Sequence, residues 1–146
     1  MTDNRRQHWD KVWAGSDEKA KSWYQEIPRI SIDLIERSGI SPHDALIDIG
    51  GGASRLVDHL LERGYSDVTV LDVSSAALKH ARARLGERAN AGTWTVADVT
   101  AFRPERHYAL WHDRAAVHFL LSEADRKAYI EALSCSLQPG GQAIIG

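Results

Sequence analysis

Residues 46–60 read LIDIGGGASRLVDHL: an apolar run with one acid, three consecutive glycines, and then the spacing of an amphipathic helix. A strand that stops at a glycine turn and leads into a helix exposes backbone N–H groups at the positive end of the helix dipole. This arrangement suits an anionic or polyhydroxylated ligand. Several cofactors fit such a turn, so the residues around it are needed to distinguish between them.

Outward from this turn, short apolar strands alternate with helical patterns along the chain. Strands are predicted at 45–49, 68–71, 93–99, 107–113 and 141–146. Helices are predicted from Ile30 to Gly39 and over 56–64, 74–86 and 122–140. Right-handed crossovers between parallel strands place helices on both faces of a sheet. The alternation therefore predicts an α/β fold with a doubly wound, Rossmann-like, mostly parallel sheet that ends at strand five.

Residues 1–28 are polar and rich in tryptophan, and they form a predicted N-terminal arm, helical in places, ahead of one domain over 29–146. Trp9 and Trp13 are four positions apart and are expected to pack one helical face on the core. Trp23 and Tyr24 either pack the arm on the body or belong to a lid, where their rings would attract a bound cation.

The composition fits a single domain with one core, at 146 residues and 16.2 kDa. The net charge is −2 and acids and bases are interspersed, which does not indicate nucleic-acid binding. The single cysteine, Cys135, excludes an internal disulfide and a cysteine-rich zinc site, and it is expected to be a small buried residue. No metal site is predicted. The sequence shows no signal-peptide core and no apolar run near the roughly 20 residues of a membrane span, so a soluble cytoplasmic protein is expected.

Three carboxylates follow or end predicted strands near the glycine turn. Asp48 precedes the first glycine by two positions, Asp72 follows the second strand and Asp98 lies at the end of the third. The dinucleotide fingerprint G-x-G-x-x-G fails, because Arg55 stands where its third glycine belongs. A carboxylate at Asp72 can accept both hydroxyls of a ribose, and one at Asp98 can accept the exocyclic amine of adenine. The pattern favours a cationic nucleoside over a pyrophosphate.

At these residues the sequence resembles the class I S-adenosylmethionine-dependent methyltransferases. LIDIGGGAS is similar to their acid-x-Gly-x-Gly-x-Gly turn, VLDVS to the ribose-binding acid, ADV to the acid beside adenine, and LQPGG to the Pro-Gly-Gly before strand five. HWDKVW, SWYQ and WHDRAAVHFLL further resemble a bacterial subgroup of these enzymes. The resemblance implies S-adenosylmethionine as cofactor, S-adenosylhomocysteine as product, and an unidentified small-molecule or protein acceptor of the methyl group.

The resemblance also implies which residues bind the cofactor. These are Asp48, Gly50, Gly51, Gly52, Ser54, Asp72, Val73, Ser74, Asp98 and Val99. Ser54 replaces the third glycine of the family turn and offers a hydroxyl to the amino acid end of the cofactor. Two rival interpretations stay open: Asp72 caps the helix that begins near Ser74, and the two valines belong to the core.

The segment WHDR at 111–114 supplies the candidate catalytic residues. His112 or Asp113 would act as a general base if the acceptor arrives protonated. Arg114 and His118 join Trp23 and Tyr24 as candidate substrate or lid residues. The simpler alternatives are an ion pair between Asp113 and Arg114, and histidines that are satisfied within the core.

Family members continue after strand five, whereas this sequence stops at Gly146. Ile144 and Ile145 would then lie on an open sheet edge, which predicts a fragment, a shortened chain or an edge paired with a second copy. Two alternative functions remain: a non-catalytic module that binds the cofactor or a partner, and, disfavoured by the missing glycine and by Asp48, a nucleotide-dependent oxidoreductase.

Overall fold

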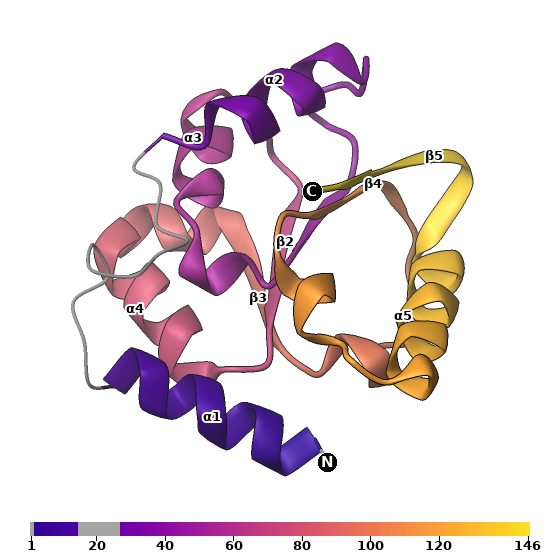
Figure 1. The fold of residues 1–146 in the computed structure, drawn as a ribbon. Helices are drawn as coiled ribbons and strands as arrows, with labels where there is room; N and C mark the ends of the chain where they lie inside the picture. Colours follow the sequence, from indigo (N-terminus) through magenta and orange to yellow (C-terminus); the bar gives the residue numbers. More distant parts are fainter. Residues whose placement is uncertain (1, 15–26) are drawn as a thin grey trace.

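The computed structural model describes residues 2–14 and 27–146 (Figure 1). The α-helices in these ranges are α1 (Thr2–Ala14), α2 (Arg29–Arg37), α3 (Leu56–Glu62), α4 (Ser75–Leu85) and α5 (Glu123–Ser136). The strands are β1 (Leu46–Ile49), β2 (Val68–Asp72), β3 (Gly92–Val96), β4 (Tyr108–Asp113) and β5 (Leu137–Ile145). Short 3-10 turns connect them: η2 (Gly51–Ala53), η3 (Gly86–Ala91), η4 (Val99–Ala101) and η5 (Ala116–Phe119).

The strands form one sheet in the order β3-β2-β1-β4-β5, and every pairing is parallel. The order reverses at β1, since the chain runs outward to β3 on one side and then crosses to β4 on the other. Such a switch point opens a crevice at the carboxyl ends of the central strands. The predicted doubly wound fold is confirmed.

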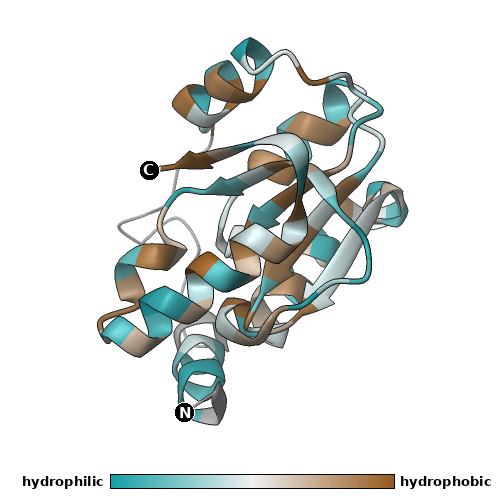
Figure 2. Cartoon of the chain, turned by 90° about the vertical axis from the view of Figure 1, so that its right-hand side faces the viewer, coloured by the Kyte–Doolittle hydropathy of each residue, from teal (hydrophilic) through white to brown (hydrophobic). Residues whose placement is uncertain are grey.

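Two apolar clusters lie on the two faces of the sheet because successive side chains of a strand point in opposite directions. Side chains of α2, α3 and α4 pack on one face with Leu46, Val68 and Leu110. Side chains of α5 and of the segments around η4 and η5 pack on the other face with Ile47 and Trp111. Figure 2 shows the apolar central strands between these layers.

Two element boundaries differ from the predictions. β3 ends at Val96 and a 3-10 turn follows, because the Asp98 side chain accepts a hydrogen bond from Thr100 N and bends the chain. The last helix ends at Ser136 instead of 140, and β5 already starts at Leu137 with an irregularity in its register on β4.

Cys135 is exposed, so the expectation that it is buried is wrong. The helix α5 turns Ala132 and Ser136, which are spaced one turn apart, toward the sheet, and both are fully buried. Cys135 lies beside this face and points to solvent.

At the far edge, β5 pairs with β4, and no second neighbour of β5 lies within the described parts of the chain. The end of this strand is apolar (Figure 2), and Ile145 is 50% exposed. Within residues 2–14 and 27–146, no helix is both long and apolar enough to cross a bilayer.

Candidate active site

The turn after β1 has no room for side chains at Gly51 and Gly52, because two carboxylates pack directly against its backbone. A Cβ atom on Gly51 would collide with the carboxylate of Asp48. A Cβ atom on Gly52 would lie 2.9 Å from Asp72 Oδ2 and 3.0 Å from the Cβ of Ala77. Gly50 adopts a left-handed φ of +69°, and its N–H donates to the carbonyl of Leu71 over 2.7 Å. The glycines therefore let the turn approach both acids.

Asp72, at the end of β2, ties the glycine turn to the start of α4. Its Oδ2 accepts from Gly52 N over 3.1 Å, and its Oδ1 accepts from Ser74 N over 2.9 Å. Burial raises the pKa of this carboxyl to about 6, against the lowering effect of the two backbone hydrogen bonds. Ser74 is the N-cap of α4, and its hydroxyl accepts from Ala77 N over 3.1 Å.

Asp48 shares a buried chain of hydrogen bonds with His112 and Ser31. His112 Nδ1 lies 2.7 Å from Asp48 Oδ1, and His112 Nε2 lies 2.8 Å from the hydroxyl of Ser31 on α2. Asp48 Oδ2 is buried and has no hydrogen-bond partner among the described residues. A buried carboxylate oxygen without a donor is costly, so this atom suits a ligand that brings one.

Asp98 follows β3 and points into the same region, with 5% of its surface exposed. Its Oδ1 accepts from Thr100 N over 2.9 Å and from Thr100 Oγ1 over 2.7 Å. Its Oδ2 forms an ion pair with Arg5 of α1.

One cavity collects most of the predicted cofactor residues at the carboxyl ends of the strands. Those that line it are Asp48, Gly50, Ser54, Asp72, Val73, Asp98 and Val99, together with His112 and Arg114 from the predicted substrate and catalytic set. Gly51, Gly52 and Ser74 do not line it and instead support the turn and the helix cap behind its wall. The hydroxyl of Ser54 accepts from Leu56 N over 3.0 Å at the start of α3.

His112 and Asp113 are neighbours in β4 and point to opposite faces of the sheet. Asp113 is fully buried and accepts hydrogen bonds from Ala116 N over 2.7 Å, Val117 N over 3.1 Å and the hydroxyl of Tyr129 over 2.6 Å. Burial raises the pKa of Asp113, and burial together with the nearby Asp113 raises the pKa of Tyr129. Asp113 does not line the cavity and fixes the start of η5.

Of the remaining predicted lid residues, the structure describes only His118. His118 is exposed, and its Nε2 lies 2.8 Å from the carbonyl of Gly146. Trp23 and Tyr24 lie outside the described residues.

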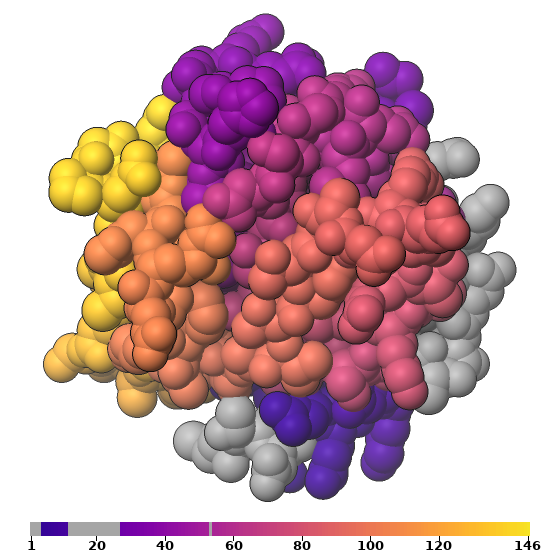
Figure 3. All heavy atoms as spheres, turned by 180° about the vertical axis from the view of Figure 1, so that it is seen from behind, coloured from indigo at the N-terminus to yellow at the C-terminus, as the bar shows by residue number. Residues whose placement is uncertain are grey.

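Helix α1 contributes cavity residues that the sequence pattern did not indicate. Arg5 and Trp9 line the cavity, and the Trp9 ring meets Phe119 edge-on with centroids 4.9 Å apart. Trp9 is not among the residues of either apolar cluster, and α1 lies across one end of the molecule (Figure 3), so its packing on the core stays a prediction; the side chain of Trp13 is not among those described. Asp10, the neighbour of Trp9 in HWDKVW, was not predicted either; it does not line the cavity but accepts a hydrogen bond from the hydroxyl of Ser74 at the start of α4.

A family model described as a methyltransferase domain matches residues 46–141. The chain belongs to the methyltransferase domain family. This match confirms the predicted methyltransferase family, and the matched residues contain the glycine turn and all three strand-end carboxylates.

Relatives of known name agree with this assignment. The bovine (Bos taurus) eEF1A lysine and N-terminal methyltransferase is 22% identical over 121 residues, which cover 82% of this chain and 17% of the relative. The domain thus corresponds to a small part of that protein.

Solved structures share the fold. One described as the conversion of a disulfide bond into a thioacetal group during echinomycin biosynthesis has a TM-score of 0.79 at 26% identity, covering 96% of this chain and 60% of that one. The glycopeptide N-methyltransferase MtfA complexed with S-adenosyl-L-homocysteine has a TM-score of 0.72 at 23% identity, covering 97% and 60%. S-adenosylmethionine, the cofactor predicted from the sequence, is bound in another structure of MtfA.

Proposed function

We propose that this domain binds S-adenosylmethionine in the cavity and transfers its methyl group to a small-molecule or protein acceptor. The observation that carries the proposal is the convergence of three buried carboxylates, Asp48, Asp72 and Asp98, on one cavity beside the glycine turn. Buried carboxylates favour a ligand that is cationic and rich in hydrogen-bond donors. A sulfonium nucleoside has both properties.

Six of the predicted cofactor residues line the cavity at positions that support a specific role. Asp72 accepts the ribose hydroxyls, Asp98 accepts the adenine amine, and Val73 and Val99 flank the base. The hydroxyl of Ser54, which already accepts from Leu56 N, donates its hydrogen to the amino acid end. The unpartnered Oδ2 of Asp48 accepts from the same end of the ligand.

When bound, the cofactor supplies a methyl group that is already activated for in-line displacement. The chain therefore has mainly to hold donor and acceptor in line, and such orientation supplies on the order of 7 to 11 kcal/mol of a barrier. Phe119 and Leu120, from the segment after β4, add apolar side chains to the lining of the cavity.

For an acceptor that arrives protonated, we propose His112 as the group that takes the proton. It lines the cavity, and Asp48, 2.7 Å from Nδ1, holds the ring in place for a proton transfer. To take the proton, its Nε2 would release the hydroxyl of Ser31 and bind the acceptor instead. Asp113 was the other candidate base. Because it does not line the cavity, it would act only indirectly, by holding the start of η5 in place. Full activity in both His112→Ala and Asp113→Asn would reject both residues as the base.

The names of the relatives suggest the classes of acceptor to test. They include an enzyme named for eEF1A lysine and N-terminal methylation and one named for glycopeptide N-methylation. We infer that a protein amine or a small peptide-derived molecule is methylated here, by an enzyme of the bacterial subgroup that carries the SWYQ and WHDRAAVHFLL motifs.

Calorimetric titration with S-adenosylhomocysteine tests the cofactor site. We expect Asp72→Ala and Asp98→Asn each to weaken binding at least tenfold. Asp67→Asn is the matched control, because Asp67 pairs with Arg106 on the surface, away from the cavity. Equal binding by all three variants would contradict the proposed site. Transfer of labelled methyl to pooled proteins and small molecules then separates an enzyme from a module that binds without turnover.

We also propose that the open edge of β5 pairs with a second copy of the chain. Ile145 is exposed, and among the residues that the structure describes β4 is the only strand beside β5, which supports this pairing. Light scattering that shows a monomer at every concentration would overturn it.

A further inference from the structure

Helix α1 is held over the cavity by polar contacts near both of its ends. Arg5 pairs with Asp98 through Nη1, and its Nη2 lies 2.9 Å from Asp125 Oδ2 in the first turn of α5. One and a half turns further on, Asp10 Oδ1 accepts from the Ser74 hydroxyl over 2.7 Å and from Ala76 N over 3.2 Å. The helix therefore spans from α5 to the start of α4.

Most of the contacts described for α1, over residues 4–11, are polar. None of the side chains described in α1 belongs to either buried cluster, and Trp9 meets Phe119, which is itself 49% exposed. An element with few buried apolar contacts opens at a low free-energy cost. Within residues 4–11, the ion pairs and hydrogen bonds of Arg5 and Asp10 are therefore the contacts whose loss should change the closed fraction of α1.

Asp98 belongs both to the contact with α1 and to the cavity. An ionised carboxylate has about four acceptor positions. The two bonds from Thr100 occupy Oδ1, and Arg5 takes one position on Oδ2. One position on Oδ2 is left for a donor inside the cavity, beside the Arg5 guanidinium. A ligand amine that donates to this position would share the Oδ2 atom of Asp98 with Arg5.

We propose that Arg5 is a positioning residue that couples the closure of α1 to the occupancy of the cavity. By bridging Asp98 and Asp125, its guanidinium keeps α1 closed and fixes the Asp98 carboxylate for the adenine amine. This inference rests on the proposed cofactor site. Its consequence is kinetic: the nucleoside leaves only after the bridge opens, so Arg5 sets the residence time of product on the enzyme.

The rate at which S-adenosylhomocysteine leaves the full chain, measured by stopped-flow displacement, tests the proposal. We expect Arg5→Ala and Asp125→Asn each to speed release about tenfold, which corresponds to about 1.4 kcal/mol. The association rate should change much less. Arg5→Lys should release the product at a rate between those of the wild type and Arg5→Ala, because an ammonium does not bridge two carboxylates in this geometry. Arg6→Ala is the matched control: it removes the same charge from an exposed neighbour in the same helix.

A second readout reports closure directly. Trypsin cleavage after the exposed Lys11 should be slowed by S-adenosylhomocysteine in the wild type and in Arg6→Ala, but not in Asp125→Asn. If the wild type does not bind S-adenosylhomocysteine in calorimetry, the proposed cofactor site itself fails. If it binds, and Arg5→Ala and Asp125→Asn release it at the rate of Arg6→Ala, the cofactor site stands and the coupling through Arg5 is overturned.

Discussion

At the residue scale, the site depends on acids that are buried next to backbone. Asp48 and Asp72 lie against the glycine turn so closely that side chains at Gly51 and Gly52 would displace them. This packing links two properties that are usually considered separately: the absence of side chains in the turn and the negative charge of the cavity. A change in either one therefore alters both ligand binding and stability.

Gly51→Ala tests this packing. The added methyl group would collide with the Asp48 carboxylate and lie 3.0 Å from Val70 Cγ1, and both neighbours are buried. We expect the free energy of unfolding to fall by about 1 to 3 kcal/mol, with at least a tenfold loss of S-adenosylhomocysteine affinity. Gly92→Ala is the control, since its methyl group would make an ordinary 3.4 Å contact with the Trp94 ring. Equal effects in urea denaturation would contradict the argument.

Asp72 predicts a dependence of stability on pH. Its pKa is about 6 in the folded state against an ordinary value of 3.8, so between these values the folded state holds a proton that the unfolded state has lost. The free energy of unfolding that this group contributes therefore falls as the pH rises from 4 to 6, by about 3 kcal/mol in total, and stays constant above. Urea denaturation of the wild type and of Asp72→Asn across this range should show a difference that changes with this sign. Parallel curves would refute it.

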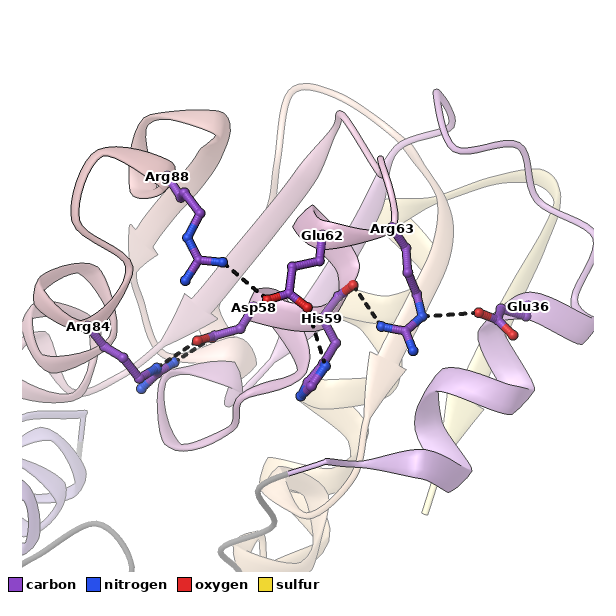
Figure 4. A network of polar contacts seen from close by, with 7 residues as sticks. All are labelled: Glu36, Asp58, His59, Glu62, Arg63, Arg84 and Arg88. Carbon is purple, nitrogen blue, oxygen red and sulfur yellow. Dashed lines mark hydrogen bonds and ion pairs between the residues drawn. The ribbon is translucent and has the colours of Figure 1, made fainter.

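At the element scale, ion pairs of very different burial connect neighbouring helices (Figure 4). Arg84 of α4 holds Asp58 of α3 through two hydrogen bonds of 2.8 and 2.7 Å, and the two side chains are 13% and 10% exposed. Arg88 and Glu62 pair nearby over 3.3 Å at 51% and 56% exposure. Burial, more than the number of pairs, decides how much each pair stabilises the packing of α4 and η3 on α3.

Arg84→Ala should therefore cost about 3 kcal/mol of unfolding free energy, because it leaves the carboxylate of Asp58 buried without its cation. Arg88→Ala should cost less than about 1 kcal/mol, since its pair is solvated. Chemical denaturation of both variants measures the contrast. Similar losses in the two would show that the difference in burial does not matter.

At the scale of the whole molecule, the switch point between β1 and β4 brings the site together. Residues from four strand ends meet there, and α1 lies across the same end of the sheet. A ligand that binds this region contacts both the sheet and its cover, so it should stabilise the fold as a unit.

Thermal unfolding with added ligands tests this expectation. At 100 times its dissociation constant, S-adenosylmethionine or S-adenosylhomocysteine should stabilise the domain by about 2.7 kcal/mol and raise Tm by roughly 5 to 10 °C. Nicotinamide dinucleotides should give no shift, because the fingerprint for their pyrophosphate is missing. A shift with the dinucleotides instead would favour the oxidoreductase alternative.

The sequence determined the layered fold and one wall of the cavity. Periods of 2 and 3.6 residues are local properties, and parallel topology brings the carboxyl ends of β1, β2 and β3 to one edge, so Asp48, Asp72 and Asp98 were predictable. The end of α5 was not, because β5 pairs with β4 from Leu137 onward, and this pairing competes with the helix.

Only the tertiary structure decided what these groups contact. Strand alternation sends His112 to Asp48 and Ser31, and Asp113 to Tyr129 on the other face, although both belong to one motif. Arg5 meets Asp98 across 93 positions of sequence. Such pairs depend on where a whole helix docks, which is set by long-range contacts that leave no period in the sequence.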